Sequence, residues 1–264
     1  MKYFDAHCHV QFDPYDEDRE AVLLAMREQE IGGLVVGVDL DSSVRALSLV
    51  QHLPGFYATA GLHPNSVLDD RFDEESFRAL LRHPKMVAVG ECGLDNFRPQ
   101  DVDAAKAEQR RVFARHIELA VEADKPLMIH GRPAKGTMDA YEDMLDILSS
   151  YKNSAGDALR GDIHFFVGGV AEAKRFIELG FTLSFTAVLT FARDYDDVVR
   201  YVPLDRILTE TDSPYVAPSR IRGQRNDPRS VVDVVDAIAE IRKEERETVR
   251  AAVLENAQRL FGLS

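Results

Sequence analysis

Histidines and acids at the ends of apolar segments are the residues of this chain that could bind a metal. The first group is Asp-Ala-His-Cys-His at residues 5–9, which follows a short apolar segment. Because side chains alternate along a strand, His7 and His9 are expected on one face with Asp5, and the two intervening residues on the other. We predict that His7 and His9 bind one ion, and that Cys8 is a small buried residue.

Two carboxylates extend this predicted site. Glu91 lies in Gly-Glu-Cys-Gly-Leu-Asp at residues 90–95, and its two oxygens can bridge cations about 3.5 to 4 Å apart. Asp212 follows the last predicted strand and can both bind a metal and accept a proton from water. Glu210 is the competing choice, because alternation puts it on the same face. We assign Glu91 and Asp212 the catalytic roles and expect Glu210 to orient a histidine ligand.

Further histidines divide into two groups. His130 and His164 each end an apolar segment, where burying an unpaired polar group costs a few kcal/mol, and we predict that both are metal ligands. His63, in Gly-Leu-His-Pro at residues 61–64, is expected at the same rim in contact with the substrate. The remaining candidates lie in or beside predicted helices and are expected to be solvated or at helix ends: His52, His83 and His116.

The segments between these motifs predict the elements that position them. Short β-branched apolar segments alternate with longer segments of helical periodicity. Strands are predicted at 2–6, 33–38, 56–60, 86–90, 126–129, 162–166, 181–185 and 206–209. Helices are predicted at 16–29, 42–52, 74–82, 104–123, 136–151, 170–179, 190–201 and 229–241, with a last helix at 246–261. This alternation favours an α/β fold, a single-domain (β/α)8 TIM barrel over residues 1–264, with functional residues at the carboxyl ends of its strands.

Composition narrows the class of protein further. The 264 residues carry a net charge of −13, with 45% hydrophobic and 29% charged residues, which excludes a disordered chain. No apolar segment reaches the roughly 18 residues of a membrane span, and two cysteines are too few for a disulfide framework, so we expect a cytoplasmic protein. The acidic balance argues against wrapping nucleic acid through bulk charge, but it permits a local basic rim.

Taken in order, these motifs resemble those of the TatD-type metal-dependent deoxyribonucleases of the amidohydrolase superfamily. The similarity covers residues 5–9, 61–64, 90–95, 129–132, 210–214 and 222–228, and the final helix at 255–261. Asn96 and the His-Phe-Phe-Val-Gly sequence at 164–168 depart from the family pattern, which alters the pocket wall and no ligand. The substrate implied is DNA, single-stranded or at an end, and the cofactor is one or two divalent ions: zinc, manganese or magnesium.

The resemblance also assigns residues to roles. It implies that the substrate phosphate faces His63 and Arg132. The metal ligands that it implies are His7, His9, Glu91, His130, His164 and Asp212.

The predicted mechanism is hydrolysis by a metal-activated water. A bound divalent ion lowers the pKa of water from 15.7 to about 7, Asp212 accepts the proton, and Arg132 stabilises the developing charge. The segment after the last strand is expected to hold DNA through a basic patch of Arg220, Arg222 and Arg225. Two alternative functions remain: an esterase, lactonase or amidase on the same barrel, and a non-catalytic metal-binding protein. The last is the weakest of the three hypotheses, because six converging ligands exceed what a structural metal site needs.

Overall fold

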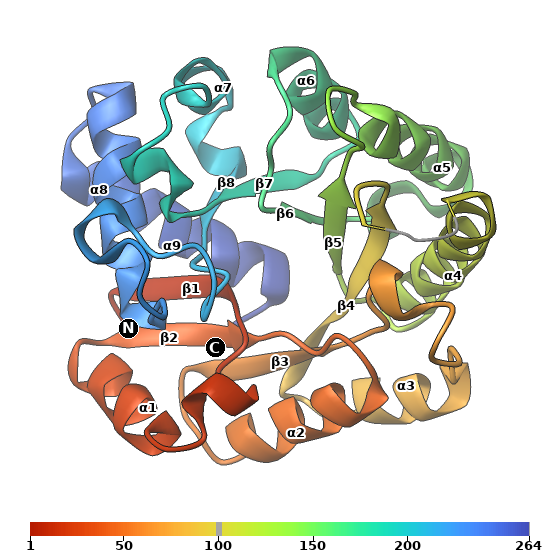
Figure 1. Ribbon diagram of the computed structural model, residues 1–264, viewed down its shortest axis with the longest axis horizontal. Coiled ribbons are helices and arrows are strands. Elements are labelled where there is room, and N and C mark those ends of the chain that lie inside the picture. The colour runs from red at the N-terminus through yellow and green to blue at the C-terminus, as the bar shows by residue number, and fades with distance from the viewer. Residues whose placement is uncertain (99–101, 264) are drawn as a thin grey trace.

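The computed structural model describes residues 1–98 and 102–263, and these form eight parallel strands in a nearly closed barrel surrounded by helices (Figure 1). The strands are β1 (Tyr3–Cys8), β2 (Ile31–Val35), β3 (Phe56–Ala60), β4 (Met86–Asp95), β5 (Leu127–Arg132), β6 (Gly161–His164), β7 (Thr182–Phe185) and β8 (Ile207–Thr209). Each strand pairs with the next in sequence. Backbone hydrogen bonds from His9 to Ser213 and from Asp212 to His7 bring the last strand back to the first. The predicted TIM barrel is confirmed.

Helices connect the strands and cover the outside of the barrel. They are α1 (Arg19–Glu28), α2 (Leu40–Val50), α3 (Glu74–Leu81), α4 (Val102–Glu122), α5 (Asp139–Ala155), α6 (Val170–Glu178), α7 (Asp196–Tyr201), α8 (Val231–Arg242) and α9 (Arg246–Phe261). Short 3₁₀ helices lie at 13–15, 64–66, 156–158, 187–190, 204–206, 219–221 and 228–230. Within the described part of the chain, no helix has the length and apolar character to cross a bilayer.

Most predicted bounds differ from the observed ones by a few residues, and the seventh helix and the fourth strand differ more. The helix predicted at 190–201 is shorter, because Ala187–Thr190 forms a 3₁₀ helix capped by the Thr186 side chain and α7 starts only at Asp196. The fourth strand was predicted to end at Gly90, but β4 continues to Asp95 because its last residues pair with β5. Glu91 therefore lies within β4, beside β5, and not in a loop after the strand.

Apolar side chains fill two layers. The larger layer lies between the sheet and the helices. The smaller contains side chains of strands, of α9 and of Val36 directly after β2, and it lies in the barrel interior: Phe4, Ala6, Leu34, Val36, Tyr57, Val87, Ala88, Met128, Leu208, Ala257 and Phe261. This packed interior leaves the carboxyl ends of the strands as the place where polar groups can converge.

The side chains of β1 do not alternate as predicted. The register between β1 and β2 shifts between Asp5 and Cys8, so Ala6 packs with the inner apolar group while Cys8 packs in the outer layer. The Asp5 carboxylate does not share the face of the histidine pair; it accepts hydrogen bonds from the Thr211 backbone at 2.9 Å and from the Thr211 hydroxyl at 2.5 Å. The prediction for Asp5 was therefore wrong. The Asp5 carboxylate connects β1 to the segment after β8 through these hydrogen bonds.

Candidate metal centre

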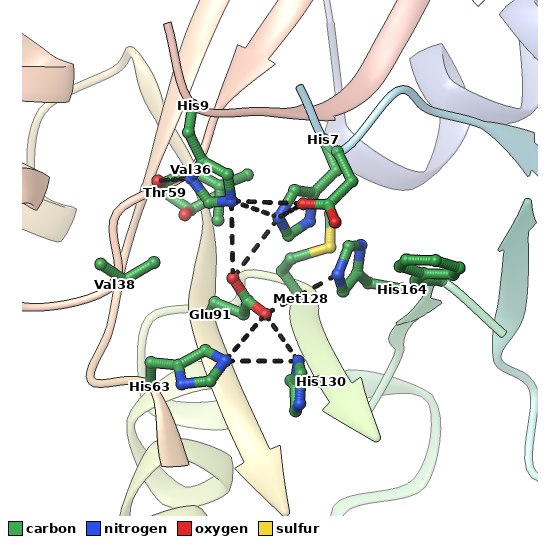
Figure 2. Close-up of polar contacts among 12 residues, drawn as sticks. His7, His9, Val36, Val38, Thr59, His63, Glu91, Met128, His130 and His164 are labelled. Atoms are coloured by element: carbon green, nitrogen blue, oxygen red, sulfur yellow. Dashed lines mark hydrogen bonds and ion pairs between the residues drawn. The ribbon is translucent and has the colours of Figure 1, made fainter. Parts of the chain in front are cut away.

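The six predicted metal ligands meet at the carboxyl ends of the strands, as Figure 2 shows for five of them by label. They come from β1 and the residue directly after it, from β4, β5 and β6, and from the segment after β8: His7, His9, Glu91, His130, His164 and Asp212. The side chains of His7, His9, Glu91 and His164 are buried. Folding thus gathers donors that are scattered along most of the sequence.

Glu91 separates the cluster into two sets of donor atoms, with His7 and His9 on one side of its carboxylate and His130 on the other (Figure 2). Its Oε2 lies 3.4 Å from His7 Nε2 and 3.9 Å from His9 Nε2. Asp212 Oδ1 lies 3.9 and 3.6 Å from the same two nitrogens. Donors bound to one cation at about 2.0 to 2.2 Å are themselves about 3 to 4 Å apart, so His7, His9 and Glu91 have the spacing of an ion site. Asp212 lies within 4 Å of both histidines.

The second set surrounds the other oxygen of the same carboxylate. Glu91 Oε1 lies 2.9 Å from His130 Nδ1 and 3.7 Å from His164 Nε2. Gly90 permits this position: its φ is +141°, and a Cβ there would lie 2.3 Å from the Met128 carbonyl oxygen. Three imidazoles surround Oε1, those of His63, His130 and His164, and two surround Oε2. Glu91 therefore offers one oxygen to each donor set, and these donors fit the divalent ions that the sequence predicts.

Acceptor groups lie behind three of the imidazoles, on the side away from the cluster. Each outer nitrogen faces an acceptor: His9 Nδ1 the Val36 carbonyl at 2.9 Å, His130 Nε2 the Asp95 carboxylate at 3.2 Å, and His164 Nδ1 the Glu210 carboxylate at 2.9 Å. With the ring proton on the outer nitrogen, the inner nitrogen of each ring has a lone pair that could bind a metal. Glu210 occupies the orienting position that we expected for it.

His63 has the opposite arrangement. Its Nδ1 accepts a hydrogen bond from the Asn65 backbone N–H at 3.1 Å, so the neutral ring carries its proton on Nε2. That Nε2 lies 3.4 Å from Glu91 Oε1 and 3.3 Å from His130 Nδ1. Burial lowers the pKa of His63, which favours the neutral ring. A protonated Nε2 has no lone pair for a metal, and His63 therefore serves as a hydrogen-bond donor beside the second donor set.

Both candidate catalytic carboxylates are held in the ionised form. Burial alone would raise the pKa of Glu91, but the neighbouring imidazoles, His63 foremost, bring it well below its usual value. Burial is likewise outweighed at Asp212, where the neighbouring histidines, His9 foremost, lower the pKa. The backbone of Asp212 has a φ of +51°, a left-handed conformation that Asp tolerates better than most residues.

We call the six predicted metal ligands the ion cluster. All of them except His7 line a pocket of about 640 Å³ whose lining also includes Arg98 and Arg132. The Arg132 guanidinium lies over the Phe97 ring, 4.2 Å from its centroid. Among the described residues, neither arginine has a carboxylate partner. In a chain with 45 acidic and 32 basic residues, these two cations remain available to an anionic substrate.

The arginines after β8 lie away from this pocket, and the predicted basic patch is not assembled there. Arg225 pairs with Asp18 at 2.6 Å and donates to the Pro14 carbonyl. Arg220 pairs with Asp233 at 2.8 Å. Arg222 packs on the Phe191 ring at 3.7 Å, and neither of these two residues lines the pocket. These three arginines, which the sequence predicts as substrate-binding residues, instead contact nearby aspartates and an aromatic ring.

His116 also differs from its predicted solvated or helix-end role. It is completely buried in α4, its Nδ1 donates to the Val112 carbonyl at 2.8 Å, and its Nε2 accepts the Leu62 backbone N–H at 3.0 Å. It therefore supports the segment that leads to His63. By contrast, His52 is exposed and His83 is half-buried.

Sequence reasoning missed several residues of the site. Asp95, which holds His130, lies four positions after Glu91 in the same motif, so strand alternation is a signal that could have found it. Arg98 and Tyr215 lie in loops around the pocket and Asn65 lies in the short 3₁₀ helix at 64–66, where no periodicity predicts the direction of a side chain.

An eight-stranded parallel barrel with histidine and carboxylate donors at the carboxyl ends of its strands defines the class of metal-dependent barrel hydrolases. The particular family follows from comparison. The family described as "TatD related DNase" matches residues 4–262, and this chain belongs to that family.

Relatives and solved structures agree with this assignment. The uncharacterized metal-dependent hydrolase YabD of Bacillus subtilis is 34% identical over 99% of both chains. The TatD protein of Mycobacterium tuberculosis, also described as a metal-dependent hydrolase, is 34% identical over 98% of this chain and 97% of its own. The crystal structure of YjjV, a TatD homologue of Escherichia coli, matches with a TM-score of 0.88 at 28% identity, over 100% of this chain and 99% of that one. This chain is a metal-dependent hydrolase of the TatD family.

Proposed function

We propose that this protein is a phosphodiesterase that cleaves DNA, either in a single-stranded segment or at an end. The observation that carries the proposal is the position of Glu91 between two donor sets, at the floor of a pocket with two unpaired arginines. Two divalent ions held by these donors would suit phosphoryl transfer, because the attacking and the leaving oxygen both need charge compensation. The description of the matching family supports DNA as the substrate.

The residues of the chain divide the work of this reaction. A divalent ion, when bound, lowers the pKa of water and withdraws charge from a phosphoryl oxygen. The ionised carboxylate of Asp212 accepts the proton of the attacking water. The Nε2–H of His63 donates to a phosphate oxygen, since its other nitrogen is occupied by Asn65. Arg132 stabilises the charge that builds up in the transition state.

The test is a direct assay of the full chain after removal of metal and reloading with zinc, manganese or magnesium. We expect cleavage of end-labelled single-stranded DNA with at least one ion, and a loss of about 10³-fold in Asp212→Asn. Asp233→Asn, which changes an aspartate that pairs with Arg220 outside the pocket, is the matched control and keeps its activity. A panel of carboxyl esters, lactones and amides completes the assay.

Turnover of an ester, lactone or amide with DNA left intact would replace this proposal with a carboxyl-bond hydrolase. A wild-type protein that is inert on every substrate with every ion would favour a non-catalytic metal-binding protein instead.

A further inference from the structure

The wall of the pocket above the ion cluster changes in character from one side to the other. The segments after β3, β4 and β5 contribute polar or charged side chains, which we call the polar arc: His63, Asn65, Ser66, Arg98 and Arg132. The segments after β6, β7, β8 and β1 contribute mainly apolar side chains, which we call the apolar arc: Phe12, Phe165, Val167, Val188, Tyr215 and Val216. Because the strands follow one another in order around the barrel, the two arcs face each other across the cluster.

Aromatic rings of the apolar arc lie against the metal ligands of both donor sets. The Phe12 ring stacks on His9 at 4.5 Å, and the Tyr215 ring approaches the same histidine at 6.4 Å. Phe165 lies 5.9 Å from His164. Tyr215 is 54% exposed, so one side of its ring is open to a ligand. A molecule whose reacting atom sits at the ions would therefore meet these rings with its neighbouring group.

The backbone at Phe165 indicates that its position is imposed by the surrounding structure. Its φ is +47°, which is unfavourable for a bulky residue. The Phe165 N–H is held by the buried Glu210 carboxylate at 2.9 Å, and the next N–H, of Phe166, donates to the Ser184 carbonyl at 3.0 Å. An aromatic side chain kept in such a conformation beside a metal ligand points to a binding role.

We propose that the apolar arc binds a planar ring joined to the scissile phosphate, namely a nucleobase stacked on Tyr215 beside Phe165, while Arg98 and Arg132 hold the phosphate. This inference rests on the proposed phosphodiesterase function and adds the orientation of its substrate: charge toward the polar arc, ring toward the apolar arc. The pocket of about 640 Å³ is of a size that holds one small ligand. Stacking tolerates any base, so the presence of the ring matters more than its identity.

The test compares three diesters on the metal-loaded full chain: thymidylyl-thymidine, and the two analogues that lack either the 5′ or the 3′ base. We expect removal of one base to lower kcat/KM about tenfold, mainly through KM, and removal of the other to change it little. Tyr215→Ala should lower kcat/KM about tenfold on the intact diester and leave the sensitive abasic analogue unchanged. Tyr215→Phe keeps the ring and should retain the rate.

The matched control is Tyr201→Ala, which removes a tyrosine that is 43% exposed on α7 outside the pocket and should affect no diester. Equal rates on all three diesters, or equal losses on all three in Tyr215→Ala, would overturn the base-binding inference while the phosphodiesterase function stands. If no diester is cleaved with zinc, manganese or magnesium, the proposed function fails and this inference fails with it.

Discussion

Arginines line two hollows of this molecule, but they are paired with aspartates in only one of them. In the hollow beside α8, each arginine forms an ion pair with an aspartate: Arg220 with Asp233, Arg225 with Asp18, and Arg229 with Asp227. In the pocket over the ion cluster, Arg98 and Arg132 have no carboxylate partner within residues 1–98 and 102–263.

The difference shows what makes an arginine available to a substrate. Both hollows offer guanidinium groups, and the net charge of −13 would favour pairing in both. In the pocket, the carboxylates at hand face imidazoles: Glu91 faces His130, Asp95 also faces His130, and Glu210 faces His164. Because histidines occupy these acids, the arginines of the pocket keep their N–H groups for an anion.

The largest effect on turnover is expected at Glu91, because, among the residues that the structure describes, the hollow beside α8 has no comparable carboxylate surrounded by histidines. Glu91→Gln removes the charge shared by both donor sets, so we expect turnover to fall by about 10³-fold or more. Elemental analysis should show that at least one ion per chain is lost, because an amide is a poor substitute for a bridging carboxylate. Full ion content with full activity would show that Glu91 does not bridge.

The arginines themselves provide the next test. Arg132→Ala should lower kcat/KM on single-stranded DNA by about 10²-fold, because an unpaired guanidinium is free to stabilise the transition state. Arg225→Ala should change kcat/KM less than about twofold, since Asp18 already neutralises it and an exposed ion pair contributes about 1 kcal/mol or less to stability. Steady-state kinetics at matched salt concentrations measure both. Similar losses in the two variants would mean that pairing does not distinguish the two regions.

The barrel and its metal ligands were largely predictable from the sequence for one physical reason. The carboxyl ends of parallel strands lie at one end of the barrel, so residues that end apolar segments must converge there. This argument places His130 and His164 without any knowledge of tertiary contacts. The bounds predicted for β3 and α9, 56–60 and 246–261, are those that the structure shows.

The partners of charged side chains could not be predicted in this way. Arg225 and Asp18 are 207 positions apart, and only the folded chain brings them together. The irregular register of β1, which turns Asp5 toward Thr211, also depends on a segment at the other end of the sequence. The same holds for His63, whose proton position follows from the turn at Asn65.

Variants of Glu210 test whether the carboxylates of the pocket orient the histidines that they contact. Its carboxylate accepts from the Ser184 hydroxyl at 2.7 Å as well as facing His164 Nδ1 at 2.9 Å. Glu210→Ala removes both contacts and the acceptor of the Phe165 N–H, and we expect the affinity for the activating ion to fall by about 10- to 100-fold. Glu210→Gln keeps an acceptor oxygen and should lose less. Metal titration followed by calorimetry measures the affinity independently of turnover, and unchanged affinity in both variants would contradict an orienting role.

The smallest effect is expected from converting the hollow into a second site with free arginines. Exchanging Asp18, Asp227 and Asp233 together for asparagine leaves three guanidinium groups without their partners. If the ion pairs are what prevents this region from binding DNA, the triple variant should bind single-stranded DNA a few-fold more tightly at low salt. The slope of log K against log salt concentration should then become steeper by about 0.7 for each additional phosphate contact. Fluorescence anisotropy over a salt series measures this, with catalytic rates as the control because the ion cluster is untouched. Binding identical to that of the wild type would show that an arginine needs the neighbouring metal ligands, and not merely the absence of an aspartate, to hold a nucleic-acid phosphate.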